Sequence, residues 1–183
     1  MRVCVFCGAS AGRGEIFRET ASEVARALVR RGAGIVYGGG SVGCMGALAD
    51  AALAEGGEVF GVIPEALAAR EVAHRGLTEL HVVGSMHERK ALMAAHSDAF
   101  LALPGGFGTM EELFEVVTWQ QLGYHSKPIA LLNVAGYFDA LLGFCDAATA
   151  ADFIRPSDRA NLLCAADVET ALDILFGELP GQS

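Results

Sequence analysis

The segment 104–112, with the sequence PGGFGTMEE, joins residue types that bind phosphate to a carboxylate that can assist bond cleavage. It follows the apolar run 99–103, which is typical of a buried strand, and precedes a stretch with helical spacing. Glycines let the backbone approach a ligand closely, and the N–H groups at the start of a helix attract anions. Glu112 follows these groups by about one helical turn. The spacing therefore predicts a phosphate site beside an acid, as cleavage of a phosphorylated small molecule requires.

The same residues have an alternative interpretation that needs no ligand. Thr109 and Glu112 have the spacing of a capping box, in which Thr109 would cap the helix and Glu112 would bond back to its first turn. A plain turn between a strand and a helix needs at most one glycine, whereas this segment has three in four positions. The glycines therefore favour a binding function over capping alone.

A second glycine-rich segment, GGGSVGCMG at 38–46, also lies between a predicted strand and a predicted helix. Its glycines formally match the G-x-G-x-x-G fingerprint of dinucleotide-binding proteins. The acidic residue of that fingerprint is poorly placed, because Glu58 begins the next strand and Glu65 lies too far along the chain. The chain contains no Gly-Lys-Ser/Thr sequence, which excludes a Walker P-loop.

The composition is that of a folded α/β protein. The chain has 183 residues, of which 52% are hydrophobic and 19% charged, enough for one domain with a substantial core. We expect a single domain over 1–176 and a loose tail over 177–183. The net charge of −9 argues against a nucleic-acid partner. We find no signal peptide and no run long enough to span a membrane, so we expect a cytoplasmic protein with no membrane partner.

The cysteines and histidines do not indicate a redox or metal centre. The five cysteines are an odd, scattered set, as is typical of reduced thiols. Cys4 and Cys7 have CxxC spacing, but residues three apart on a strand face opposite sides. We therefore expect both to be small buried apolar residues. The five histidines show no spacing of paired metal ligands, so we expect no metal site.

Strand and helix patterns alternate along the whole chain. Strands are predicted at Val3–Cys7, Gly34–Tyr37, Glu58–Ile63, Glu79–Val83, Ala99–Leu103 and Pro128–Leu132, with a short edge strand near 162–164. Helices are predicted at Glu15–Arg31, Met45–Ala54, His87–Ala95, Met110–Leu122, Tyr137–Ala148 and Val168–Phe176. Apolar strands without alternation indicate a parallel sheet that is covered on both faces. The fold class is therefore α/β, with a doubly wound, Rossmann-like parallel sheet, and ligands are expected beyond the carboxyl ends of its strands.

Six segments occur in the order that a known family uses: VFCGAS at 5–10, 38–46, MHERK at 86–90, DAFLAL at 98–103, 104–112 and TWQQLG at 118–123. Together they resemble the Lonely guy (LOG) family, from about residue 2 to about residue 133. Segment 104–112 matches the family's PGGxGTxxE element at every fixed position, and 38–46 resembles its GGGxxGxMG element. Phe107 stands where tyrosine is common and Cys44 where leucine is common.

The resemblance implies a cytokinin riboside 5'-monophosphate phosphoribohydrolase. Such an enzyme cleaves the N-glycosidic bond of a nucleoside monophosphate, here a cytokinin riboside 5'-monophosphate or AMP, and releases the free base and ribose 5-phosphate. Arg89 and Glu112 match the family's catalytic residues. Positions that match its substrate contacts are Glu71, Arg89, Lys90, Gly106, Phe107, Gly108, Thr109, Met110, Glu111, Glu112 and Thr118. The glycine loops add Gly105, Gly39, Gly40 and Ser41 as candidates for substrate binding.

Members of the family often carry the label lysine decarboxylase-like, and this sequence argues against that chemistry. Lys90 and Lys127 are its only lysines, and neither lies in a recognisable pyridoxal-phosphate motif. We expect no cofactor. Glu112 would stabilise positive charge on the ribose, and Arg89 would hold phosphate or ribose hydroxyls and position Glu112.

Two other functions remain open from the sequence. Molybdenum-cofactor carriers resemble this fold and use similar glycine loops, so a non-enzymatic carrier of a nucleotide or of that cofactor is the main alternative. The interpretation as a dinucleotide-binding oxidoreductase depends on the fingerprint at 38–43 alone. The sequence does not decide between adenine and an isoprenoid-substituted adenine as the base.

The resemblance also implies a homodimer, with the active sites near the subunit boundary. The predicted helix at Met110–Leu122 is apolar on more than one side. We expect one side to pack on the sheet and Trp119 with its neighbours to be free for a partner helix.

Overall fold

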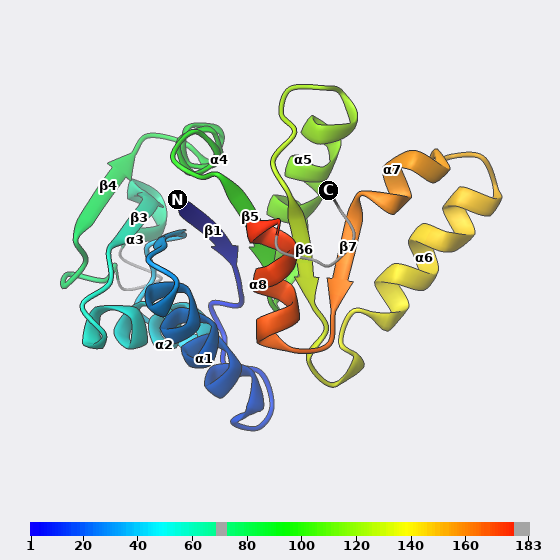
Figure 1. Ribbon diagram of the computed structural model, residues 1–183. Helices are drawn as coiled ribbons and strands as arrows, with labels where there is room; N and C mark the ends of the chain where they lie inside the picture. Colours follow the sequence, from blue (N-terminus) through cyan, green and yellow to red (C-terminus); the bar gives the residue numbers. More distant parts are fainter. Residues whose placement is uncertain (69–72, 178–183) are drawn as a thin grey trace.

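Seven parallel strands form one sheet in the order β4-β3-β2-β1-β5-β6-β7 (Figure 1). The computed structural model describes residues 1–68 and 73–177. The strands are β1 (Arg2–Phe6), β2 (Gly34–Tyr37), β3 (Val59–Pro64), β4 (Glu79–Val83), β5 (Ala99–Ala102), β6 (Ile129–Leu132) and β7 (Leu162–Ala165). From β1 the chain winds outward to β4, then returns to place β5 on the other side of β1. This arrangement confirms the predicted doubly wound α/β fold.

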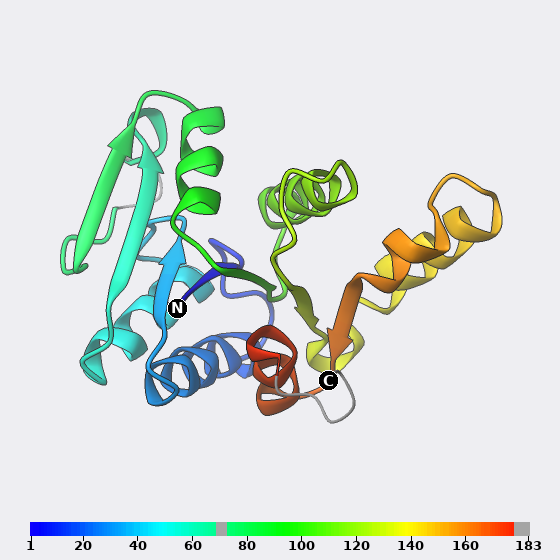
Figure 2. The same ribbon diagram turned by 45° about the horizontal axis from the view of Figure 1, so that its top comes forward.

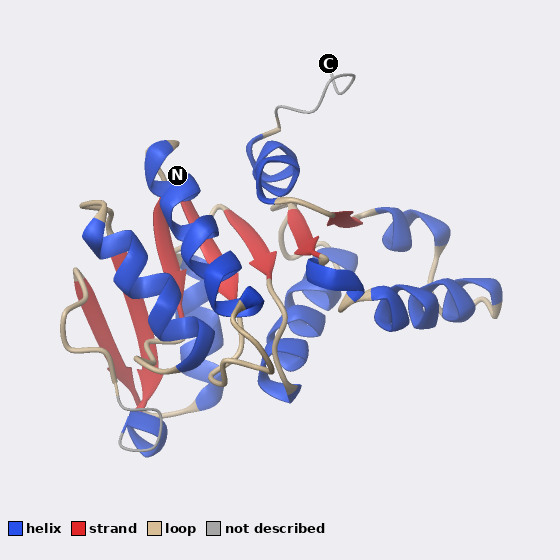
Figure 3. Ribbon diagram, turned by 90° about the horizontal axis from the view of Figure 1, so that it is seen from below, coloured by secondary structure: helices blue, strands red, loops and turns tan. Residues whose placement is uncertain are grey.

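Helices cover both faces of the sheet, which a parallel sheet of buried strands requires (Figure 2). The helices are α1 (Ile16–Arg30), α2 (Gly43–Ala54), α3 (Glu65–Ala68), α4 (Met86–Ala95), α5 (Phe107–Gln121), the 3-10 turn η1 (Val134–Gly136), α6 (Asp139–Ala150), α7 (Pro156–Ala160) and α8 (Val168–Phe176). Helices α1, α2 and α8 pack on one face, and α4, α5 and α6 on the other. In Figure 3, α6 and α7 extend outward beside the last strands.

The two faces of the sheet hold two separate apolar cores, because successive residues of a strand point to opposite sides. On β1, Val3 and Val5 lie in the core beneath α1 and α2, whereas Cys4 and Phe6 lie in the core beneath α4 and α5. Cys7 belongs to the first core and Cys4 to the second. The two thiols are therefore separated by the sheet and are not a dithiol pair, as the CxxC spacing on a strand predicts.

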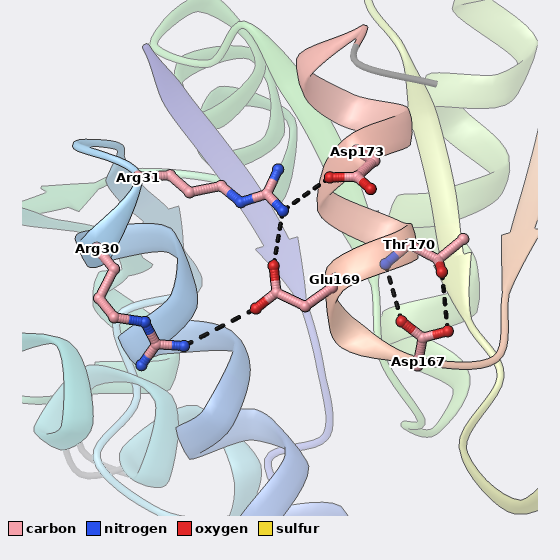
Figure 4. A network of polar contacts seen from close by, with 6 residues as sticks. All are labelled: Arg30, Arg31, Asp167, Glu169, Thr170 and Asp173. Atoms are coloured by element: carbon pink, nitrogen blue, oxygen red, sulfur yellow. Dashed lines mark hydrogen bonds and ion pairs between the residues drawn. The ribbon is translucent and has the colours of Figure 1, made fainter. Parts of the chain in front are cut away.

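Polar contacts hold the end of α1 against α8 (Figure 4). The Arg31 guanidinium lies 2.6 Å from Glu169 and 2.7 Å from Asp173, and its hydrogen bond to Glu169 raises the pKa of Arg31. Asp167 caps α8 by accepting a hydrogen bond from the backbone N–H of Thr170. These contacts join the first helix to the last one, so that the chain closes over one face of the sheet.

The predicted elements all occur, including the edge strand near 162–164, which is β7. Three short elements, α3, η1 and α7, were not predicted, because pieces of three to five residues carry too little periodicity to be recognised. Helix α5 begins at Phe107, earlier than predicted. Residues 178–183 of the expected tail lie outside the described part of the chain. Among the helices that the structure does describe, none has the length and apolar character to cross a membrane.

Candidate active site

A cavity of about 500 Å³ opens at the carboxyl edge of the sheet, between the ends of β1 and β5. The chain leaves these neighbouring strands in opposite directions, which forms the crevice where doubly wound folds bind ligands. Its lining residues come from the loops after both strands, from α1, α2, α4 and α5, and from the turn after η1: Cys7, Gly8, Ala9, Ser10, Ala11, Gly12, Phe17, Cys44, Met45, Arg89, Pro104, Gly105, Gly106, Gly108, Thr109, Glu112 and Tyr137. Its size suits a nucleotide-sized ligand.

One wall of the cavity is the loop that leads from β5 into α5. Gly106 is the N-cap residue of α5 and has no side chain to offer the first turn, so the N–H groups there are available to an anion. Gly105 must be glycine, because a Cβ at this position would lie 2.1 Å from Thr109 Oγ1 and 2.9 Å from the Gly8 backbone nitrogen. The cavity wall thus carries a helix start whose backbone N–H groups have no side-chain cap, and phosphate binding there stays a prediction.

The capping box that Thr109 and Glu112 suggested does not form. Because α5 begins at Phe107, Thr109 lies inside the first turn and is not the N-cap residue. The buried side chain of Thr109 packs against Gly105. Thr109 and Glu112 both line the cavity. Both residues thus face the cavity from inside the helix.

Arg89 is held in a fixed orientation although it is almost fully buried, at 5% exposure. Its Nε donates to the Val62 carbonyl at 3.1 Å and its Nη2 donates to the Gly38 carbonyl at 2.9 Å. Its Nη1 lies 3.8 Å from Glu112 Oε1. Val62 lies within β3 and Gly38 directly follows β2, so these carbonyls aim one edge of the guanidinium at Glu112.

The second glycine loop supports this arginine. A Cβ at Gly38 would lie 2.1 Å from Arg89 Nη2, so only glycine leaves room for the guanidinium. Gly43 has a φ of +64°, and a Cβ there would lie 2.3 Å from the Ala9 carbonyl oxygen. The absence of a side chain at Gly43 therefore lets this loop pack closely against the loop after β1. Gly39, Gly40 and Ser41 do not line the large cavity among the described residues. Their contact with substrate stays a prediction.

Lys90 is buried, but its ammonium lies against α5 instead of in the large cavity. It pairs with Glu111 and lies 2.9 Å from Glu115. Burial lowers the pKa of Lys90, but the hydrogen bonds to these two carboxylates raise it above its ordinary value overall. Lys90 is therefore an ammonium at neutral pH that ties α4 to α5, next to both Arg89 and Glu112.

Three further predicted contact residues, Phe107, Met110 and Thr118, do not line the cavity. The Phe107 side chain is 96% exposed, and Thr118 is exposed on α5 with its hydroxyl bonded to the Phe114 carbonyl at 2.7 Å. Met110 packs against the core beneath α5. Glu71 lies outside the described residues.

Two thiols, Cys7 and Cys44, line the floor of the cavity. Burial raises the pKa of Cys7 well above its usual range, and nearby Cys44 and Glu112 add to this effect. Burial also raises the pKa of Cys44. Both thiols are therefore protonated at neutral pH and are poor nucleophiles. Within residues 1–68 and 73–177, no cluster of side chains has the composition of a metal site.

Several residues that line the cavity were not predicted as substrate contacts, among them Gly8–Gly12, Phe17, Met45 and Tyr137. A signal for the loop was present, because it follows the first strand at the carboxyl edge. No local pattern marks Phe17 or Tyr137, since only the fold brings α1 and the turn after η1 to the crevice.

Fold and cavity define an α/β protein of the Rossmann-like class, with an uncapped helix start and an arginine–glutamate pair at its topological switch point. The family model described as possible lysine decarboxylase matches residues 45–175. A probable cytokinin riboside 5'-monophosphate phosphoribohydrolase from Oryza sativa subsp. japonica is 51% identical over 98% of this chain and 79% of its own length. A protein named cytokinin riboside 5'-monophosphate phosphoribohydrolase from Rhodococcoides fascians is 53% identical over 93% of this chain and 86% of its own. The chain belongs to the LOG family.

Solved structures with a similar fold include the molybdenum cofactor carrier protein from Chlamydomonas reinhardtii. It matches with a TM-score of 0.72 and 22% identity, over 96% of this chain and 98% of that chain. The molybdenum cofactor binding protein from Rippkaea orientalis matches with a TM-score of 0.70 and 19% identity, over 97% of this chain and 96% of that chain. At these identities the likeness shows the fold alone.

Proposed function

We propose that this protein is a nucleoside 5'-monophosphate phosphoribohydrolase that acts on a cytokinin riboside 5'-monophosphate or on AMP. The observation that carries the proposal is that the start of α5 and the Arg89–Glu112 pair line one cavity. Relatives about half identical over nearly the whole chain are named for this reaction. Release of free adenine from AMP by the purified protein, followed by chromatography, tests the proposal.

The proposed reaction breaks the bond between C1' of the ribose and the nitrogen of the base, and the bonding electrons leave with the base. Positive charge develops on the ribose, and the Glu112 carboxylate stabilises it. Glu112 also accepts a proton from the attacking water, whose oxygen bonds to C1', and the departing base gains a proton. Arg89 holds Glu112 and the ribose in place, because its two carbonyl anchors prevent it from turning away.

The 5'-phosphate is expected to bind at the N-terminus of α5, where the helix dipole and the backbone N–H groups attract an anion. This local attraction acts against the net charge of −9 of the whole chain. A comparison of rates for AMP and isopentenyl-adenosine monophosphate distinguishes the two candidate bases.

The phosphate is expected to be required for efficient turnover. Binding energy from a remote group lowers the barrier at the reacting centre, so adenosine should have a kcat/KM about a thousandfold lower than AMP. Steady-state kinetics with both substrates measure this ratio. Equal values would mean that Gly105 to Thr109 do not hold a phosphate.

The alternative function as a carrier predicts tight binding without turnover. A carrier needs no acid aimed at a sugar carbon, and the burial of Glu112 beside Arg89 in the cavity favours hydrolysis. A protein that binds AMP and returns it unchanged after prolonged incubation would support the carrier function. The oxidoreductase alternative predicts an absorbance band of bound nicotinamide in the purified protein.

A homodimer is also part of the proposal, and the structure changes which residues of α5 are candidates for its interface. Trp119 and Val117 are half-buried against the core beneath α5, so the expectation that Trp119 is free for a partner is wrong. The exposed apolar side chains of α5 and its C-cap are instead Phe107, Phe114 and Leu122. Such side chains are costly to leave in water when they form a patch.

Replacing Leu122 with Asp is expected to weaken the dimer, because the side chain is 61% exposed in one chain and a buried charge in an interface is strongly unfavourable. Sedimentation velocity over a range of concentrations measures the change. Val82→Asp, at a 57% exposed position on the edge strand β4, serves as a control for a general loss of solubility. A native protein that is monomeric and fully active at low concentration would exclude the dimer.

A further inference from the structure

Tyr137 reaches the cavity from a turn that is built to aim it there. The turn follows β6, and its ends are tied by Asn133, whose side chain donates to Asp139 at 2.7 Å and accepts from the Phe138 backbone N–H at 2.7 Å. Inside the turn, Ala135 has a φ of +51°. Residues other than glycine and asparagine rarely adopt this left-handed backbone conformation. Such backbone strain persists only where the surroundings enforce it, and it is often found at functional sites.

The Tyr137 hydroxyl makes a specific contact with the first glycine of the segment 104–112. It donates to the Gly105 carbonyl oxygen at 2.5 Å. A carbonyl can only accept, so the single proton of the hydroxyl is committed to this bond. The hydroxyl therefore presents lone pairs to its other neighbours and is a poor direct ligand for a phosphate. The contact shown acts on the loop.

The phosphate loop needs such a contact because glycines leave its peptide groups free to rotate. The carbonyl of Gly105 and the N–H of Gly106 belong to one planar trans peptide group, so fixing the oxygen also fixes the direction of the N–H. The preceding carbonyl, of Pro104, accepts a hydrogen bond from the Gly8 N–H at 3.2 Å. Two successive peptide groups at the start of α5 are thus oriented from outside the loop, one by Gly8 and one by Tyr137.

The ring of Tyr137 is itself held in place by two aromatic neighbours. It packs edge-to-face with Phe17, with ring centroids 6.0 Å apart, and with Phe138, at 5.2 Å. These contacts reduce the rotamer freedom of Tyr137 before any ligand binds, so the hydroxyl loses little entropy in bonding to Gly105.

We propose that Tyr137 is a positioning residue for phosphate binding, which orients the Gly105–Gly106 peptide group so that the start of α5 receives the 5'-phosphate. The identity of the ligand as a ribose 5-phosphate group rests on the proposed function. The role of the hydroxyl is nevertheless open to a binding measurement that requires no turnover.

The test is the substitution Tyr137→Phe, which keeps the ring and removes only the hydroxyl. Titration calorimetry measures binding of ribose 5-phosphate and, separately, of adenine, to the full chain. Loss of the hydrogen bond is expected to weaken ribose 5-phosphate binding about tenfold, with adenine binding unchanged within about twofold. Tyr124→Phe is the matched control, because Tyr124 is exposed, does not line the cavity and loses the same hydroxyl.

Selective weakening of ribose 5-phosphate binding by Tyr137→Phe, with no change in Tyr124→Phe, supports the proposal. Unchanged binding of both ligands overturns it, and so does an equal loss for both, since that result would reflect a general distortion of the cavity. A chain that binds ribose 5-phosphate but does not hydrolyse AMP contradicts the proposed function and leaves this test of Tyr137 intact.

Discussion

Replacing Glu112 with glutamine should slow hydrolysis of AMP by roughly a hundredfold or more while the fold is retained. The substitution preserves the size of a side chain that is buried beside Arg89, but removes the charge that stabilises the ribose and the base that accepts the water proton. The effect should fall on kcat, because charge develops on the ribose in the transition state and not in bound substrate.

Single-turnover and steady-state rates, with circular dichroism as a check of folding, measure this loss. Glu115→Gln is the matched control, since Glu115 is on the same helix one turn further along and pairs with Lys90 instead of facing the cavity. A Glu112→Gln protein that turns over at the normal rate would show that this carboxylate has only a structural role.

The second large effect is expected from Gly38→Ala, a change of one methyl group outside the cavity lining. Its Cβ would lie 2.1 Å from Arg89 Nη2, so the guanidinium has to leave the Gly38 carbonyl that it now contacts at 2.9 Å. Arg89 then loses its aim at Glu112, and we expect about a hundredfold loss of kcat/KM, because small displacements of catalytic groups are costly.

Gly143→Ala is the control for this substitution, because the position is exposed on α6 and a Cβ there meets nothing within 4 Å. It should retain full activity and, as a helical alanine, slightly increase stability. Wild-type kinetics in Gly38→Ala would mean that the anchoring of Arg89 by β2 does not matter for catalysis. Arg89→Ala is measured beside Gly38→Ala. A similar loss of kcat/KM in these two variants would indicate that Gly38→Ala acts through Arg89.

The order of the elements could be predicted from the sequence because its signals are local. Uninterrupted apolar runs such as 99–103 indicate buried parallel strands, and the glycines that follow them mark the carboxyl edge where ligands bind. For the same reason the sequence identified Glu112 and the start of α5 as a candidate site. Local patterns were weaker at the ends of elements. Thr109 was expected to be the N-cap of α5, but Gly106 has the extended N-cap conformation, so the helix begins at Phe107.

The tertiary structure decided which distant residues meet. The contact between Gly38 and Arg89 depends on α4 lying across the ends of β2 and β3, and the bond from Tyr137 to Gly105 depends on the turn after β6 lying beside the loop after β5. The sequence also did not show that Lys90 is paired with carboxylates of α5. Sequence by itself determined the strands, the glycine loops and the acid, since each is encoded by adjacent residues. The cavity was decided only by strand order, because placing β5 next to β1 brings residues about a hundred positions apart into one site.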